Sequence, residues 1–189
     1  TAALVCIFAP HVFTGGFALT MMKQMGTMII FALSYNMLLG QGGMLSFGHA
    51  VYSGLGAYIT VHALNLVGKG ALSTPLPLLP LVGGAAGLAF GVLFGYVTTR
   101  RAGVTFALIS LGVGEMVFAC VLMFPGFFGG EAGVSTNRVV GQPFLGLSFG
   151  PAIQVYYLVA FWCFLCMAAM FALTQTPLGR MANAVRDNP

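Results

Sequence analysis

The sequence predicts an all-α fold, a polytopic bundle of transmembrane helices with about six spans in this fragment. Of the 189 residues, 59% are hydrophobic and only 5% are charged, and the mean hydropathy is +0.97. A soluble domain carries about 25% charged residues, so this chain has too few to give such a domain a polar surface. The 27 glycines fit the same class, because glycine is frequent in membrane helices and lets their backbones approach closely.

The apolar stretches have the length of bilayer spans. A helix needs roughly 20 mostly apolar residues to cross the hydrocarbon core. The expected spans are 1–9, 17–39, 44–67, 76–99, 104–124 and 152–174. The apolar run already begins at Thr1, so we expect a first helix that is clipped and one truncated transmembrane domain over 1–189. Residues 175–189 are expected to begin a cytoplasmic segment.

Basic residues orient these spans, because Lys and Arg are enriched in cytoplasmic loops. If Arg100 and Arg101 are cytoplasmic, alternation of the spans brings Arg180 and Arg186 inside as well. Lys23, Lys69 and Arg138 then lie outside, which leaves a modest excess of basic residues inside.

Small residues recur along two of the expected helices. Gly83, Gly87, Gly91 and Gly95 are spaced four apart, so they share one narrow stripe of the fourth span. These overlapping G-x-x-x-G units predict close helix packing without a substrate role. A weaker stripe at the start of the third span, Ser46, Ala50 and Gly54, suggests a similar contact.

Glu115 is the strongest candidate for a functional polar residue within a span. It falls near the middle of the fifth span, where a carboxylate must be paired, protonated or in contact with a wet cavity. It either lines or gates a transport pathway, or it is a protonated side chain bonded to a neighbouring helix.

A second candidate site is the glycine-rich break Gly40-Gln41-Gly42-Gly43, which is followed by Ser46 and His49. Three glycines in four residues disfavour a straight helix. Irregular backbone at membrane depth is tolerated where it is buried in protein or lines an aqueous cavity. Gln41, Ser46 and His49 are therefore candidate pathway or gate residues. The alternative is a plain cytoplasmic turn capped by Ser46.

The C-terminal segment predicts a short amphipathic helix. Thr176 followed by Pro177 has the pattern of an N-cap and a first helical proline. Leu178, Met181 and Val185 share one face, and Arg180 and Arg186 mark a more polar one. Such a helix could lie on the membrane surface or contact a cytoplasmic partner.

Signatures of enzymes are missing from the sequence. It has no phosphate loop, no G-x-S-x-G and no H-E-x-x-H motif, and it has too few carboxylates for metal-dependent chemistry. We therefore expect a transport subunit without its own catalytic residues, cofactor or metal. If energy is coupled to transport, the nucleotide machinery is on another chain.

Four segments in the same order resemble the permeases of branched-chain amino-acid ABC importers, the M-type subunit in particular. Residues 36–50 and 56–58 look like N-L-L-x-G-x-x-G-x-x-S-x-G-H-A…G-A-Y, and the N-F-A-H-G usual in the H-type subunit is lacking. Residues 100–111 with Gly114 and Glu115 resemble R-x-x-G-x-x-F-A-x-x-T-L-x-x-x-E, with Ser110 where Thr is usual.

The other two segments lie in the C-terminal third. Residues 129–135 are similar to T-G-G-x-x-G-I, and 176–180 with 184–188 look like S-P-F-G-R-x-x-x-A-I-R-E-N. The resemblance implies a bacterial inner-membrane channel made with a second permease subunit and driven by alternating access. It also implies two cytoplasmic ATPase subunits that bind ATP, a periplasmic substrate-binding protein, and an ATPase-docking region just beyond Pro189.

The alternatives differ in substrate or in energy source. Urea and short-amide permeases share much of the signature, so leucine, isoleucine and valine are the weakest part of the resemblance. An ion-coupled secondary transporter, a channel or a structural subunit would need no ATPase. Co-purification with an ATPase would separate the first class from these.

Overall fold

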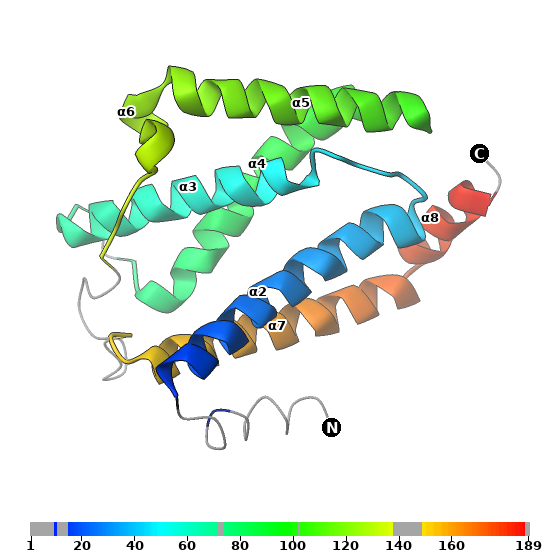
Figure 1. Ribbon diagram of the computed structural model, residues 1–189. Coiled ribbons are helices and arrows are strands. Elements are labelled where there is room, and N and C mark those ends of the chain that lie inside the picture. Colours follow the sequence, from blue (N-terminus) through cyan, green and yellow to red (C-terminus); the bar gives the residue numbers. More distant parts are fainter. Residues whose placement is uncertain (1–9, 11–14, 72–73, 102, 138–148, 188–189) are drawn as a thin grey trace. The chain divides into compact units, whose positions relative to one another are not determined.

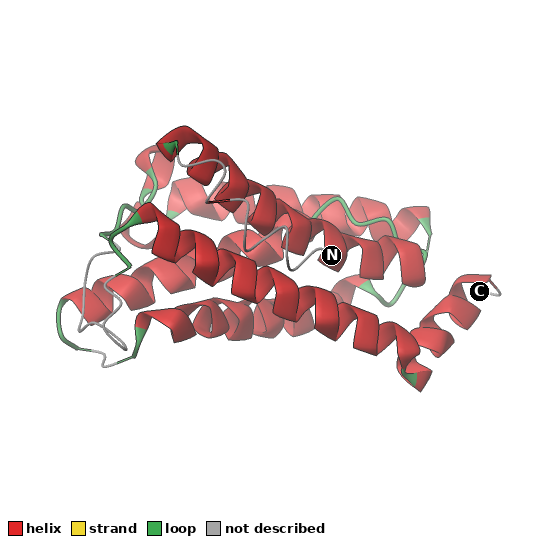
Figure 2. Cartoon of the chain, turned by 90° about the horizontal axis from the view of Figure 1, so that it is seen from below, coloured by secondary structure: helices red, strands yellow, loops and turns green. Residues whose placement is uncertain are grey.

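Hydrocarbon offers the backbone no hydrogen-bond partner, so a chain this apolar pairs its N–H and C=O groups within helices. The computed structural model describes residues 10, 15–71, 74–101, 103–137 and 149–187 (Figure 1). Within these ranges the elements are helical and no strand occurs (Figure 2). The predicted all-α class is confirmed.

The helices fall into two compact units, which are described separately. One unit comprises Thr1–Gly43 and Leu147–Pro189, and the other comprises Met44–Gly146. The first contains α2 (Gly16–Asn36), the π-helical η1 (Met37–Gln41), α7 (Ala152–Gln175) and α8 (Pro177–Asp187). The second contains α3 (His49–Gly68), η2 (Leu76–Leu78), α4 (Leu79–Thr98), α5 (Val104–Met123), α6 (Pro125–Phe128) and η3 (Gly130–Ala132).

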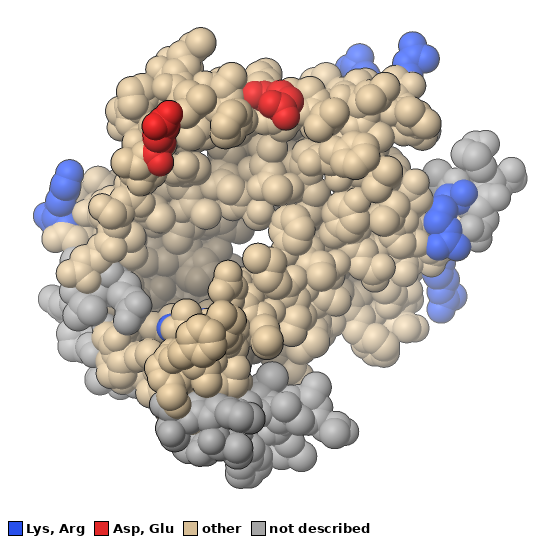
Figure 3. All heavy atoms as spheres, viewed as in Figure 1, with Lys and Arg blue, Asp and Glu red and all other residues tan. Residues whose placement is uncertain are grey.

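Five helices are long and apolar enough to cross a membrane: Gly16–Gln41, His49–Gly68, Leu76–Thr98, Val104–Met123 and Ala152–Gln175. They correspond to five of the six expected spans, and the sixth, 1–9, lies outside the described residues. Many of their large apolar side chains are exposed, for example Leu88 at 70% and Phe118 at 61%. Figure 3 shows how few Lys, Arg, Asp and Glu side chains interrupt this surface on the face drawn. A hydrocarbon environment suits such a surface.

In the first unit α2 and α7 run side by side in the same direction (Figure 1). A Cβ at Gly26 would lie 2.8 Å from Cγ1 of Val159, so the two helices are close near their middles. Beyond the C-terminal ends of α2 and α7, Arg186 of α8 donates to the carbonyl oxygen of Gly40 in η1. Three spans separate α2 from α7 along the chain, so alternate crossing of a bilayer requires this parallel arrangement.

The second unit is built on the contact between α3 and α4. A Cβ at Gly56 would lie 2.7 Å from the Gly83 carbonyl oxygen, and one at Gly83 would collide with the Thr60 hydroxyl. Thr60 itself donates to the Gly56 carbonyl at 2.8 Å. Small residues therefore let the two backbones touch, as in other close membrane-helix pairs.

The expected third span begins later than the apolar run suggests. Residues 44–48 are not part of a helix, and α3 starts at His49 with Gly48 as its N-cap residue. The Phe47 N–H donates to the Ser110 hydroxyl of α5 at 3.0 Å, and Ser110 in turn donates to the Ala107 carbonyl at 2.8 Å. The prediction of a helix from residue 44 was wrong, because a tertiary hydrogen bond replaces the helical one.

The structure contradicts the predicted cap at Ser46 and confirms Thr176 as the N-cap position of α8. No side chain caps α3, so Ser46 does not play the role that the plain-turn alternative gave it. Helix α8 begins at Pro177 as expected. The Thr176 hydroxyl, however, donates backward to the Leu173 carbonyl at 2.6 Å. It therefore satisfies a carbonyl at the end of α7, where the helix ladder has run out. Thr176 still has the extended backbone of an N-cap residue, and its carbonyl accepts from the Arg180 N–H of α8 at 3.3 Å.

Alanine at Gly56 should destabilise the fold, because its Cβ has no room beside the Gly83 carbonyl. We expect Gly56→Ala to lower the free energy of unfolding by about 1–3 kcal/mol, as overpacking does. The matched control is Gly54→Ala on the same helix, where a Cβ meets nothing within 4 Å. The measurement is the folded fraction of the purified, detergent-solubilised complete protein after heating. Equal stability of the two variants would contradict the close contact.

Alanine at Ser110 should loosen the segment that leads into α3. Ser110 is only 2% exposed, so Ser110→Ala leaves the Phe47 N–H without its acceptor. We expect the free energy of unfolding to fall by about 1–3 kcal/mol. Ser110→Thr keeps the hydroxyl and should retain more stability in the same heating assay. The control is Ser53→Ala, which removes only an exposed bond within α3. If Ser110→Ala behaves like Ser53→Ala, the hydroxyl does not hold this segment.

Candidate functional site

The glycine-rich break is a π-helical end of α2 followed by a left-handed glycine. In η1 the Gly42 N–H reaches back to the Met37 carbonyl at 3.3 Å, and the Gly43 N–H bonds the Leu39 carbonyl at 3.0 Å. Gly43 has φ +66°, a conformation that glycine adopts without the penalty other residues incur. The chain leaves the helix at this point.

Gln41 is the last residue of η1 and the second residue of this break. Its Oε1 atom is buried and has no hydrogen-bond partner within the described part of the chain. A buried amide oxygen without a donor is unusual, and it has the chemistry to accept from an ammonium group, a hydroxyl or water. Gln41 therefore has the properties of a ligand-contacting residue, which stays a prediction.

Ser46 and His49 belong to the other unit. Ser46 is 4% exposed, and His49 opens α3 with its ring edge-on to Tyr52 at a centroid distance of 6.3 Å. A Cβ at Gly48, between them, would collide with the Ser110 carbonyl. The segment carrying both candidates is thus packed directly on α5.

Glu115 is the twelfth residue of the 20 in α5, which agrees with its expected place near the middle of a span. It is exposed, whereas Ser110 on the same helix is buried. Five residues along an α-helix correspond to a rotation of about 140°. Glu115 therefore points away from the face of α5 that receives the Ser46–His49 segment.

The four candidate pathway residues do not form one described cluster. Gln41 is in the first unit, and the other three are in the second. Within the second unit, Ser46 and His49 share a segment, while Glu115 is on a different face of α5. Their shared role as pathway or gate stays a prediction.

The glycine stripe of α4 divides into two halves. Gly83 lies against Gly56 and Thr60, and a Cβ at Gly87 would lie 3.4 Å from the Tyr52 carbonyl oxygen. Around Gly91 and Gly95, no described atom from outside the helix's own backbone comes within 4 Å of the corresponding position. Gly54 of the weaker stripe is also in open space, and Gly56 makes the contact instead. Only the tertiary structure identifies which small residues touch.

The predicted partner-contact residues of α8 point in different directions. Leu178 is 70% and Met181 63% exposed, and Arg180 is exposed as well. Arg186 donates to the Gly40 carbonyl at 2.6 Å. The side chain of Val185 lies outside the described ones. Contact of this helix with a cytoplasmic partner stays a prediction.

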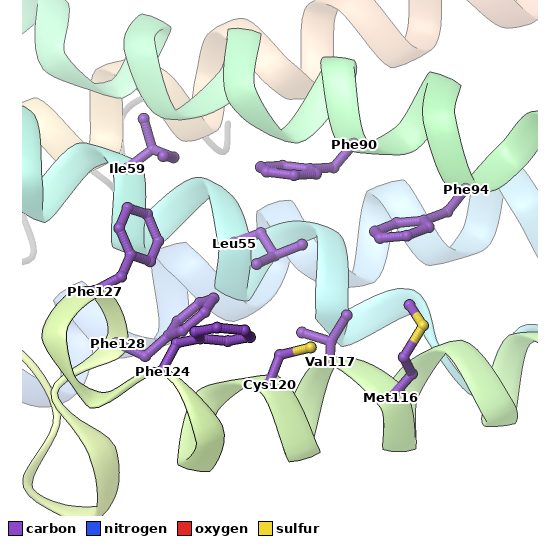
Figure 4. A pocket seen from close by; sticks show the side chains of 10 residues that line it. All are labelled: Leu55, Ile59, Phe90, Phe94, Met116, Val117, Cys120, Phe124, Phe127 and Phe128. Atoms are coloured by element: carbon purple, nitrogen blue, oxygen red, sulfur yellow. The ribbon is translucent and has the colours of Figure 1, made fainter.

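The second unit also holds an apolar pocket of about 270 Å³ between α3, α4, α5 and α6 (Figure 4). Its lining consists of Leu55, Ile59, Phe90, Phe94, Met116, Val117, Cys120, Phe124, Phe127 and Phe128. None of these side chains is charged, and none carries a hydroxyl or amide group. The pocket therefore offers nothing to hold the ammonium and carboxylate of an amino acid.

Sequence reasoning missed the residues that anchor the loop after α5. His62 of α3 is 2.7 Å from the Phe127 carbonyl oxygen through Nε2, and its ring stacks on that of Phe127. The Thr136 hydroxyl donates to the Asn65 side-chain oxygen at 2.6 Å. Both contacts are distant in sequence, so spacing could not reveal them. Among the described residues, no group of three His, Cys, Asp or Glu could hold a metal ion.

Comparison with known proteins extends over nearly the whole chain. A family model described as "Branched-chain amino acid transport system / permease component" matches residues 17–189. The high-affinity branched-chain amino acid transport system permease protein LivM of Escherichia coli (strain K12) is 29% identical over 181 residues, 85% of this chain. LivM of Salmonella typhimurium (strain LT2) gives the same identity and coverage.

The chain spans 41% of the length of each of these relatives. No solved structure matches it significantly. The resemblance predicted from the motifs is confirmed by the family model and by LivM. Since the match includes every described span helix and the glycine-rich break, the chain belongs to the family of branched-chain amino acid transport system permease components.

Proposed function

We propose that this chain is part of the permease subunit of an ATP-driven importer for leucine, isoleucine and valine in the bacterial inner membrane. The observation that carries the proposal is the family match over residues 17–189. The five apolar span helices agree with it, since a permease must line a path through lipid.

The pathway forms between this subunit and a second permease subunit. The exposed Glu115 supports this part of the proposal, because a mid-span carboxylate on an apolar helix needs a polar partner or water. Gln41 adds a buried amide oxygen with a free lone pair. In the proposed mechanism, Gln41, Ser46, His49 and Glu115 contact the solute or gate its path.

Energy comes from two cytoplasmic ATPase subunits, and a periplasmic binding protein delivers the substrate. The permease itself performs no covalent chemistry and holds no cofactor. ATP binding on the partner chains drives alternating access. Helix α8 supports this arrangement, because its exposed Leu178 and Met181 give a cytoplasmic protein an apolar surface to contact.

Uptake of radiolabelled solutes tests the substrate class. In a strain with the complete gene deleted, leucine, isoleucine and valine uptake should fall to background and return when the gene is restored. Urea uptake should not change. Loss of urea uptake alone would favour the short-amide alternative. Uptake that survives ATP depletion but is abolished by a protonophore would contradict ATP coupling.

Removal of the Glu115 charge tests the pathway role. Glu115→Gln keeps the size of the side chain and removes the carboxylate. We expect it to raise the barrier to transport by about 1.4 kcal/mol and so to lower the maximal uptake rate about tenfold. The control is Glu131→Gln, which removes a carboxylate that lies outside the spans, in η3. Co-purification of the partner subunits shows that assembly is intact. Normal transport by Glu115→Gln would exclude a role that needs the charge.

A further inference from the structure

Arg186 connects the C-terminal amphipathic helix to the glycine-rich break. Its guanidinium Nη1 donates to the Gly40 carbonyl at 2.6 Å, across 146 positions of sequence. Both groups belong to the same compact unit. We infer that Arg186 is a positioning residue that latches α8 onto the break and holds the break in its observed shape. The importance of this latch for transport rests on the proposed function; the latch itself does not.

The Gly40 carbonyl needs a donor from outside its own helix. The last carbonyls of a helix have no N–H ahead of them, and here the chain turns away at Gly43 with φ +66°. The ends of helices also carry partial negative charge, which favours a cation. Arg186 is in the last turn of α8 as well, so its positive charge also favours the C-terminal end of its own helix.

The fit is steric as well as polar. A Cβ at Gly43 would lie 2.6 Å from Cγ and 3.4 Å from Cβ of Arg186. The aliphatic stem of the arginine therefore packs against the glycine while its guanidinium reaches Gly40. Any larger residue at position 43 would push the stem away.

Helix α8 has an inner and an outer face. Gly179 and Arg186 are seven residues apart, within about 20° of the same face. Gly179 is buried, and a Cβ there would lie 2.5 Å from the Leu173 carbonyl oxygen, so this face is pressed on the end of α7. Leu178 is about 100° from Gly179 and about 80° from Arg186, and Met181 is about 160° and 140° from them; both Leu178 and Met181 are exposed.

Because of this geometry, α8 can transmit a movement from its outer face to the break. A protein that moves the outer face must move Arg186 too, because the helix is stiff over its 11 residues. The Gly40 carbonyl then loses or regains its donor. A change on the cytoplasmic side is thus transmitted to the end of α2 without a contact between the partner and α2.

The accessibility of a cysteine at Leu39 tests the latch directly. Leu39 is in η1 and is 39% exposed. In the complete protein, with every native cysteine replaced by alanine, among them Cys6, Cys120, Cys163 and Cys166, Leu39→Cys is labelled with N-ethylmaleimide in native membranes. Adding Arg186→Ala should raise the labelling rate about threefold to tenfold, the range for loss of one net hydrogen bond. Arg186→Lys should restore part of the protection.

Two controls separate the latch from general damage. Gln175→Ala removes an exposed polar side chain at the end of α7 in the same unit and should leave the Leu39→Cys labelling rate unchanged. A chain that keeps Cys163 as its sole cysteine reports unfolding of the same unit, because this thiol is 5% exposed in α7. It should stay unreactive with Arg186→Ala. An unchanged rate at Leu39→Cys, or an equal rise at Cys163, would overturn the proposal.

The glycine side of the latch gives an independent test. Gly43→Ala should raise the labelling rate at Leu39→Cys, and combining it with Arg186→Ala should add little, because both changes break the same contact. Gly70→Ala controls for backbone strain alone, since Gly70 has φ +73° with nothing within 4 Å. Additive effects of Gly43→Ala and Arg186→Ala would contradict the latch.

A transport measurement then asks what the latch does. In the assembled importer, Arg186→Ala should lower the leucine imported per ATP hydrolysed, and Arg186→Lys should restore part of that ratio. An unchanged ratio would show that the latch does not couple the two events. Because labelling needs no transport activity, failure of the proposed function and failure of the latch give different results.

Discussion

Unpaired backbone groups at membrane depth are the constraint on which the rest of this structure depends. Within the spans the helical ladder satisfies them, and where the ladder stops another part of the chain must supply the partner. At residues 40–48 two such partners come from distant elements: Arg186 for the Gly40 carbonyl and Ser110 for the Phe47 N–H. The chain on each side of the boundary between the two units therefore has its own hydrogen-bond partner.

The two partners belong to different units, so each unit makes its own hydrogen bond next to the unit boundary. Arg186 fixes the end of α2 from α8, whereas Ser110 fixes the start of α3 from α5. Each of these two interactions is a hydrogen bond between elements, and not a covalent bond or a large apolar contact. Such bonds contribute modestly to stability, so they are compatible with the change of shape that the proposed alternating access requires.

Close helix packing also depends on a few specific residues. Glycine at positions 56 and 83 lets the α3 and α4 backbones touch, whereas Gly91 and Gly95 face open space within the described chain. Leu88 and Phe118 present large apolar surfaces. The relatives are more than twice as long as this chain, and the second permease subunit that we propose would cover part of such surfaces. The exposed Glu115 is part of the same outward surface.

The sequence by itself determined the class, the number of spans within the described residues and the family, because hydropathy over about 20 residues and ordered motifs are local properties. It also located the glycine-rich break and placed Glu115 near mid-span. Only the tertiary structure decided that α3 starts at His49, that Gly56 and not Gly54 meets α4, and that Arg186 bonds Gly40. Each of these depends on a partner tens of residues away, and spacing along one helix cannot specify such a partner.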